Sequence, residues 1–193
     1  MDQKAITKDE INELPIVKFN GEMHIITDQE GCVRALEALA GEKILGFDTE
    51  TKPAFKKGVS HKVSLLQLST NENAYIFRLN KCTLTKGLCD LLSNENIVKT
   101  GVSIRDDIKG LRKLNDFEPG GFVELGDLAK KLEIKQLGLR SLAGMFLGYR
   151  VSKRFQLTNW ELPKLTEDQF RYAATDAWVG LCLYNKMKAL LPN

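Results

Sequence analysis

A short apolar run that ends in two acids is the strongest constraint on the fold. The stretch ILGFDTET covers residues 44–51, and its first half has the length and character of a buried β-strand. Side chains two residues apart on a strand point to the same side of a sheet, so Asp48 and Glu50 can converge beyond the strand end. Such a D-x-E pattern also fits two solvated acids that begin a loop, so it needs support from elsewhere in the chain.

Strand and helix patterns alternate through the remainder of the chain. A strand pair that turns at Asn20-Gly21 is expected over residues 15–27, because this dipeptide suits a tight hairpin. The next segment predicts a helix that Asp28 caps and Gly41 stops, with Val33, Leu36 and Leu39 on one face. Further strands are expected at 43–48, 63–70, 73–79, 97–102 and near 121–124, and further helices at 84–96, 103–115, within 125–134, around 139–148 and at about 167–190.

Strands that cluster early and alternate with helices later predict an α/β fold, in which helices cover both faces of a mixed β-sheet. With 193 residues, 43% of them hydrophobic, the chain fits a single domain over residues 1–193. No apolar run approaches the roughly 20 residues that a membrane span needs, and the polar start does not resemble a secretory signal. The four cysteines form no C-x-x-C pair. We therefore expect a cytoplasmic protein with no membrane partner.

A further acid lies in the predicted C-terminal helix. Asp176 is the only charged residue between Tyr172 and Asn185, and apolar residues surround it on nearly all sides of the helix. An ionised carboxylate in such a position needs a partner, because its desolvation costs several kcal/mol. Tyr172 lies one turn earlier on the same face. A lysine or arginine from elsewhere in the chain is one possible partner for Asp176, and a metal ion is another.

The segment KTGVSIRDDIKG predicts a strand that ends at Gly101 and turns into a helix. Ser103 can cap this helix, and Asp106 and Asp107 suit its positive N-terminal end. Asp107 falls about one turn into the helix, so it can also face the sheet.

Acids gathered at one place repel each other unless a cation lies between them. Carboxylate oxygens suit Mg²⁺ or Mn²⁺, and the lack of nearby His or Cys pairs argues against zinc or copper. Two such ions roughly 3.5–4 Å apart activate a water and stabilise the leaving oxygen in phosphodiester cleavage. The acids therefore predict a nuclease site.

The same segments resemble a known family. FDTE, GVSIRDD and LTEDQFRYAATDA are similar, in order and in local sequence, to the three motifs of the DEDD 3'-5' exonucleases that carry a tyrosine in the third motif. The likeness is greatest to the Werner-syndrome exonuclease domain and then to ribonuclease D. VSLLQLST and NWELPKLTEDQ strengthen the resemblance, which covers about residues 25–190. It implies a ribonuclease H-like fold and two divalent metal ions, Mg²⁺ or Mn²⁺.

The resemblance also implies roles for individual residues. Asp48 matches the acid that bridges both metal ions, Glu50 its companion ligand and Asp176 the ligand of the third motif. Asp107 matches the second-motif acid better than Asp106 does, because it lies six positions after the motif's glycine. Tyr172 matches the tyrosine that orients the attacking water; with an ordinary pKa of about 10 it is a poor base at neutral pH.

Nucleic acid with a free 3' end is the expected partner, and its phosphates need basic side chains around the acidic centre. The net charge of +3 is too small to indicate this by itself. The candidates for contact with the strand are Lys52, Lys56, Lys57 and Lys62 after the first motif, Arg150, Lys153 and Arg154 before the third, Phe55 and Phe155 as stacking surfaces, and His61 as a surface or substrate-facing residue. Solvated loop charges are the alternative for each lysine and arginine.

The resulting hypothesis is a metal-dependent 3'-5' exonuclease that releases 5'-monophosphates. Two alternatives stay open. The first is a catalytically silent module that binds a nucleic-acid end or a protein, and the second is a hydrolase with a paired-carboxylate acid and base.

Overall fold

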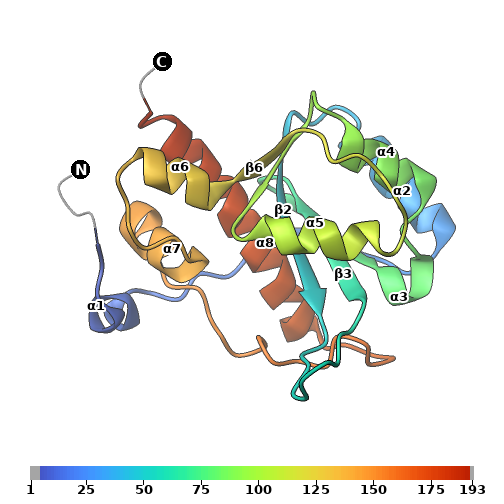
Figure 1. Ribbon diagram of the computed structural model, residues 1–193, viewed down its shortest axis with the longest axis horizontal. Coiled ribbons are helices and arrows are strands. Elements are labelled where there is room, and N and C mark those ends of the chain that lie inside the picture. Colours follow the sequence, from blue (N-terminus) through green and yellow to red (C-terminus); the bar gives the residue numbers. More distant parts are fainter. Residues whose placement is uncertain (1–4, 192–193) are drawn as a thin grey trace.

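A six-stranded mixed sheet forms the centre of the structure, a computed structural model that describes residues 5–191 (Figure 1). Its order is β1-β4-β3-β2-β5-β6, and β3 runs antiparallel to both of its neighbours while the other pairs are parallel. The strands are β1 (Glu22–Ile26), β2 (Ile44–Thr51), β3 (Val63–Ser69), β4 (Asn73–Arg78), β5 (Val98–Gly101) and β6 (Phe122–Glu124). The predicted mixed sheet is confirmed, and β2 carries both of its acids within the strand.

Helices cover both faces of this sheet, as predicted. The helices are α1 (Lys8–Glu13), α2 (Gln29–Leu39), α3 (Leu79–Cys82), α4 (Lys86–Ser93), α5 (Ile104–Arg112), α6 (Leu125–Lys131), α7 (Leu139–Leu147) and α8 (Glu167–Lys188). Helices α2, α4 and α5 cover one face of the sheet, and α8 packs on the other face with α6 and α7 beside it; in Figure 1, α2 and α4 lie to the right of β2 and β3, and α5 lies in front. No helix within residues 5–191 combines the length and apolar character that a membrane span requires.

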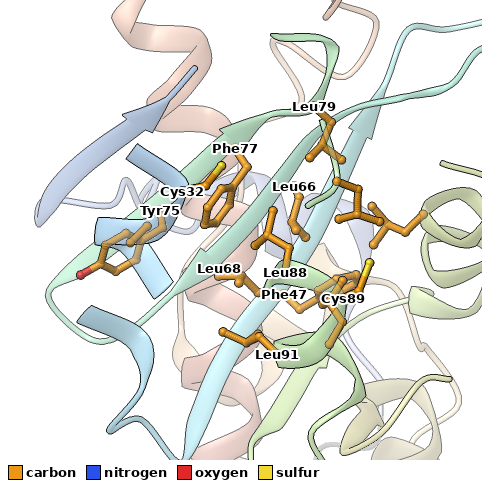
Figure 2. Packing of buried hydrophobic residues seen from close by; sticks show 14 of the residues in the cluster. Cys32, Phe47, Leu66, Leu68, Tyr75, Phe77, Leu79, Leu88, Cys89 and Leu91 are labelled. Atoms are coloured by element: carbon orange, nitrogen blue, oxygen red, sulfur yellow. The ribbon is translucent and has the colours of Figure 1, made fainter. Parts of the chain in front are cut away.

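Strand β3 is buried on both faces. Leu66 and Leu68 point with Phe47 into the layer beneath α2 and α4 (Figure 2). Leu65 packs on the opposite face, in a cluster with Ala173 of α8. This double burial explains why the sequence VSLLQLS lacks the alternation of a half-exposed strand.

Helix α8 lies unusually close to β2. A Cβ atom added at Gly46 would fall 2.0 Å from the carbonyl oxygen of Ala177, so the strand backbone meets the helix backbone directly. Ala173, Ala174 and Ala177 are fully buried at this contact. Small residues therefore determine how near Asp176 comes to the acids of β2.

The predicted strand pair over residues 15–27 is wrong, because only β1 forms and it pairs with β4 in parallel. The residues before β1 form hydrogen bonds with other segments. The Val17 amide donates to the Arg150 carbonyl over 3.1 Å, and the Phe19 amide donates to the Thr175 hydroxyl over 3.0 Å. Gly21 allows a close approach to the Glu72 carbonyl instead of forming a hairpin turn. Long-range contacts thus override the local turn signal.

Helix α2 is capped by Asp28, as predicted, since its carboxylate accepts from the Gly31 amide over 2.8 Å. The predicted apolar face is shifted, however. Val33 is 50% exposed, whereas Cys32, Ala35 and Leu39 are buried. Leu36 and Leu39 of the predicted face do pack on the core, and Cys32 and Ala35 complete the buried face in place of Val33.

The predicted side-chain cap of α5 is also wrong. Ser103 has a positive φ of 62° and its side chain makes no capping hydrogen bond. The Glu124 carboxylate of β6 caps the helix instead, since it accepts from the Ser103 and Ile104 amides, each over 2.9 Å. The cap that holds the second acidic motif therefore comes from a neighbouring strand.

We expect Glu124→Gln to lower the free energy of unfolding by about 1 kcal/mol, because it removes the charge from a helix N-terminal cap. Ser103→Ala is the matched control, and it should change stability by less than about 0.5 kcal/mol, since that hydroxyl caps nothing. Urea denaturation of both variants measures the difference. A larger loss of stability for Ser103→Ala than for Glu124→Gln would show that the serine hydroxyl, and not Glu124, caps α5.

Candidate active site

Three acids, two from β2 and one from α8, converge where this strand and this helix pack together. Asp48 and Glu50 come from β2 and Asp176 from α8, and a carboxylate oxygen of each lies within 4.8 Å of the other two. Both strand acids point to the same side because they are two residues apart. The predicted convergence of these three side chains is therefore present in the structure.

Burial makes the charged forms of these acids unfavourable. Desolvation raises the pKa of Asp48 and of Glu50 well above the ordinary value, and mutual repulsion within the cluster raises both further. Desolvation also raises the pKa of Asp176 to about 7, although a hydrogen bond from Tyr172 lowers it in part. Without a cation, the cluster therefore holds protons near neutral pH.

Asp107 lies near this cluster but does not join it. It accepts a hydrogen bond from the Thr49 hydroxyl, and Thr49 points to the face of β2 opposite to that of its two acidic neighbours. Desolvation raises the pKa of Asp107 to about 6. Its charge still raises the pKa of Asp48 and Glu50, so it acts on the cluster from the α5 side.

Tyr172 lies against two aromatic rings. Its ring stacks on Trp160 with centroids 6.1 Å apart, and it meets the edge of Phe155 at 6.0 Å. Burial, followed by the charges of Asp176 and Glu50, raises the pKa of its hydroxyl above 10. Tyr172 therefore stays neutral at physiological pH and can donate or accept a hydrogen bond, but it cannot serve as a phenolate.

The segment that carries Trp160 is held by a buried arginine that the sequence does not single out. The Arg78 guanidinium is 2% exposed and donates to the carbonyl oxygens of Leu162 and Pro163, over 2.5 and 3.0 Å. The positioning of Tyr172 thus depends on β4 through this loop. An arginine that ends an apolar strand was the available signal.

Tyr172 and Asp176 line two cavities, and the segment 151–156 contributes residues to both. Arg154 and Phe155 line the first cavity, together with Lys18 and Arg171, and Lys153 lines the second with Arg140. Of the residues predicted to contact nucleic acid, Lys153, Arg154 and Phe155 therefore each line a cavity together with Asp176. Arg154 is also 3.8 Å from the Asp168 carboxylate and covers the Phe155 ring.

The other predicted contact residues do not line these two cavities. Lys56 and Lys57 are exposed in the loop after β2 and line neither cavity. His61 lies 3.5 Å from the Glu161 carboxylate, which also pairs with Lys52 over 3.2 Å. Arg150 is tied into the fold by its backbone, which bridges to Ile16.

The donor set fits a divalent cation. Asp176 Oδ1 is buried without a hydrogen-bond partner, and among residues 5–191 no lysine, arginine or histidine forms an ion pair with Asp48, Glu50 or Asp176. Three oxygens that converge without a protein cation match the preference of Mg²⁺ and Mn²⁺ for hard ligands. This acid triad can therefore hold a divalent metal ion.

Known structures share this architecture. The Aedes aegypti Nibbler EXO domain superposes with a TM-score of 0.78 at 22% identity, over 86% of this chain and 87% of that one. Escherichia coli RNase D gives a TM-score of 0.77 at 22% identity, over 86% of this chain and 44% of that one. The fold is therefore ribonuclease H-like, as the resemblance implied.

Sequence relatives define the family. The mouse bifunctional 3'-5' exonuclease/ATP-dependent helicase WRN is 34% identical over 96% of this chain, which spans 14% of that protein. An Arabidopsis thaliana 3'-5' exonuclease is 28% identical over 91% of this chain and 67% of its own length. A 3'-5' exonuclease family model matches residues 23–192. The chain belongs to this 3'-5' exonuclease family.

We expect the metal-free protein to lose stability as the pH rises from about 4 to 7. A carboxyl whose folded pKa is raised binds its proton more tightly in the folded state, so stability falls as pH climbs from the unfolded value of about 4 through the folded value. Burial raises the pKa of Asp107 to about 6 and that of Asp176 to about 7, and these values set the upper end of the window. Asp176→Asn should flatten the slope of melting temperature against pH, measured with chelator present.

Asp106→Asn is the matched control, because Asp106 is an exposed acid whose pKa is lowered by Lys109. It should leave the slope of melting temperature between about pH 4 and 7 unchanged. A parental slope in Asp176→Asn would show that this acid is not destabilised in the fold.

Proposed function

We propose that this chain removes nucleotides from the 3' end of nucleic acid by metal-dependent hydrolysis, and that it releases 5'-monophosphates. The observation that carries the proposal is the convergence of Asp48, Glu50 and Asp176 without a protein cation; Asp176 also lines two cavities that carry basic side chains. Membership of the 3'-5' exonuclease family supports it. A silent binding module would have no need for a buried acidic cluster that destabilises the fold.

In this proposal the acids hold two ions of Mg²⁺ or Mn²⁺. Asp48, Glu50 and Asp176 supply the first ligands, and Asp107 contributes from the α5 side. Divalent cations in such a site lower the pKa of a water nucleophile and neutralise the charge on the leaving oxygen. The high proton affinity of the acids makes cation binding compete with protonation, so we expect tighter binding at higher pH.

Tyr172 has a positioning role in the proposal. Its neutral hydroxyl adjoins Asp176, and its ring is held by Trp160 and Phe155. The oxygen of a fixed hydroxyl can accept a hydrogen bond from the attacking water and so direct the lone pair of that water toward the phosphorus. The rigid ring supplies orientation, which is one of the larger contributions to catalysis in sites of this kind.

The nucleic acid would lie along the two cavities to which the segment 151–156 contributes. Lys18, Arg154 and Arg171 in one cavity, and Arg140 and Lys153 in the other, can pair with phosphates. Phe155 can stack on a base, provided that it keeps its contact with Tyr172. The related fold of Trypanosoma brucei RNase D in complex with RNA U12 supports a nucleic-acid substrate.

We expect the purified protein to shorten 5'-labelled oligonucleotides stepwise in the presence of Mg²⁺ or Mn²⁺. Asp48→Asn should fall below about 1% of the parental rate, because it removes a charged ligand at the centre of the cluster. Gel analysis of single-stranded DNA, recessed duplex DNA and RNA measures both activity and substrate class. Binding without shortening would favour the silent module, and digestion that survives chelation would favour the paired-carboxylate hydrolase.

Tyr172→Phe should lower the turnover rate on the order of 10- to 100-fold while metal affinity changes little, since it removes only the positioned hydroxyl. The measurements are single-turnover digestion at saturating Mn²⁺ and calorimetric Mn²⁺ titration. Tyr184→Phe is the matched control, because Tyr184 lies on the same helix away from the acids and is buried in the α6–α7 cluster. Equal losses of turnover and metal affinity in Tyr172→Phe would contradict the positioning role.

A further inference from the structure

Gln67, in the middle of β3, is a buried polar residue without a partner. Its side chain is fully buried, and neither Oε1 nor Nε2 forms a hydrogen bond. An unpaired amide in an apolar interior costs roughly 1–3 kcal/mol, so such a group in a folded protein calls for an explanation. An apolar residue of similar volume would fill this position without that cost.

The position of Gln67 identifies its neighbour. Gln67 is the register partner of Asp48 in the antiparallel pair of β2 and β3, so the two side chains share one face of the sheet. Leu66 and Leu68 point toward α2 and α4 (Figure 2), and strand alternation directs Gln67 toward α8. Directly opposite residues on one face have Cβ atoms about 4.5–5.5 Å apart, within reach of a glutamine side chain.

The chemistry of the two groups is complementary when Asp48 serves as an ionised metal ligand. An ionised carboxylate only accepts hydrogen bonds, and the Gln67 amide carries two N–H donors. A hydrogen bond from a neutral donor to a buried carboxylate is roughly twice as strong as one between neutral groups.

We propose that Gln67 is a positioning residue for Asp48: its Nε2 donates to the Asp48 carboxylate when a divalent cation occupies the acid cluster. This inference rests on the proposed function, because it requires the cluster to bind a cation. The amide then fixes the rotamer of the Asp48 carboxylate. The unpaired amide is explained as part of a site prepared for a charged carboxylate.

Ser69 provides a matched control on the same strand face. It is fully buried, and its Oγ also lacks a partner. It lies opposite Gly46 beneath Ala177, one strand repeat farther from the acids. Ser69 thus shares the burial and the unmet hydrogen bond of Gln67 but not its neighbour.

The test compares Gln67→Met and Ser69→Ala in Mn²⁺ titration calorimetry, together with urea denaturation in chelator. We expect Gln67→Met to bind Mn²⁺ about 10-fold more weakly, which is the usual effect of removing a group that orients a metal ligand. Its metal-free stability should equal or exceed that of the parent, because the unpaired amide is gone. Ser69→Ala should bind Mn²⁺ as the parent does.

Parental Mn²⁺ affinity in a folded Gln67→Met protein would overturn the assignment and leave the proposed function intact. An absence of Mn²⁺ binding in the parent itself would instead remove the proposed function, and this inference with it. Gln67→Leu guards against a packing effect of methionine. If Leu and Met variants both lose metal-free stability but keep parental affinity, Gln67 is a structural residue only.

Discussion

The backbone contact between α8 and β2 is the interaction on which the site depends. Gly46 removes the side chain that would keep the Ala177 carbonyl away, and a row of alanines lets the helix rest on the strand. Asp176 precedes Ala177 by one residue, so this contact carries its carboxylate to Asp48 and Glu50. A larger residue at the contact would separate the acids before it disturbed any of them directly.

The same proximity places like charges in an apolar interior. Hydrophobic packing of the central sheet and α8 offsets the destabilising effect of the acids, and the raised pKa values record that effect. A cation converts this repulsion into coordination, which links metal binding to the stability of the whole domain. Arg78 and Glu124 support the site from a distance, because each forms long-range hydrogen bonds to a segment that carries or contacts a site residue.

Most secondary elements were predictable because their patterns are local. The caps, apolar runs and helical spacing around β3, β5 and α8 depend on neighbouring residues alone. The errors arose where hydrogen bonds to distant segments replace local ones. Residues 15–19 bond to α8 and to Arg150 instead of forming a hairpin, and Glu124 caps the helix that Ser103 was expected to cap. Charge alone marked Lys56 and Lys57 as candidate contacts, whereas only the structure shows that Arg154 and Lys153 line cavities with Asp176.

The sequence by itself determined the identity of the acids, their convergence along β2 and the family to which the chain belongs. Strand geometry requires residues two apart to share a face, and an ionised acid in an apolar helix requires a cationic partner or a metal ion. Only the tertiary structure decided that Asp107 approaches from the other face through Thr49, that Trp160 supports Tyr172, and that Gln67 is buried unpaired opposite Asp48. Those relations depend on strand register and on the approach of α8, which arise from packing across the whole core and leave no periodic trace in the sequence.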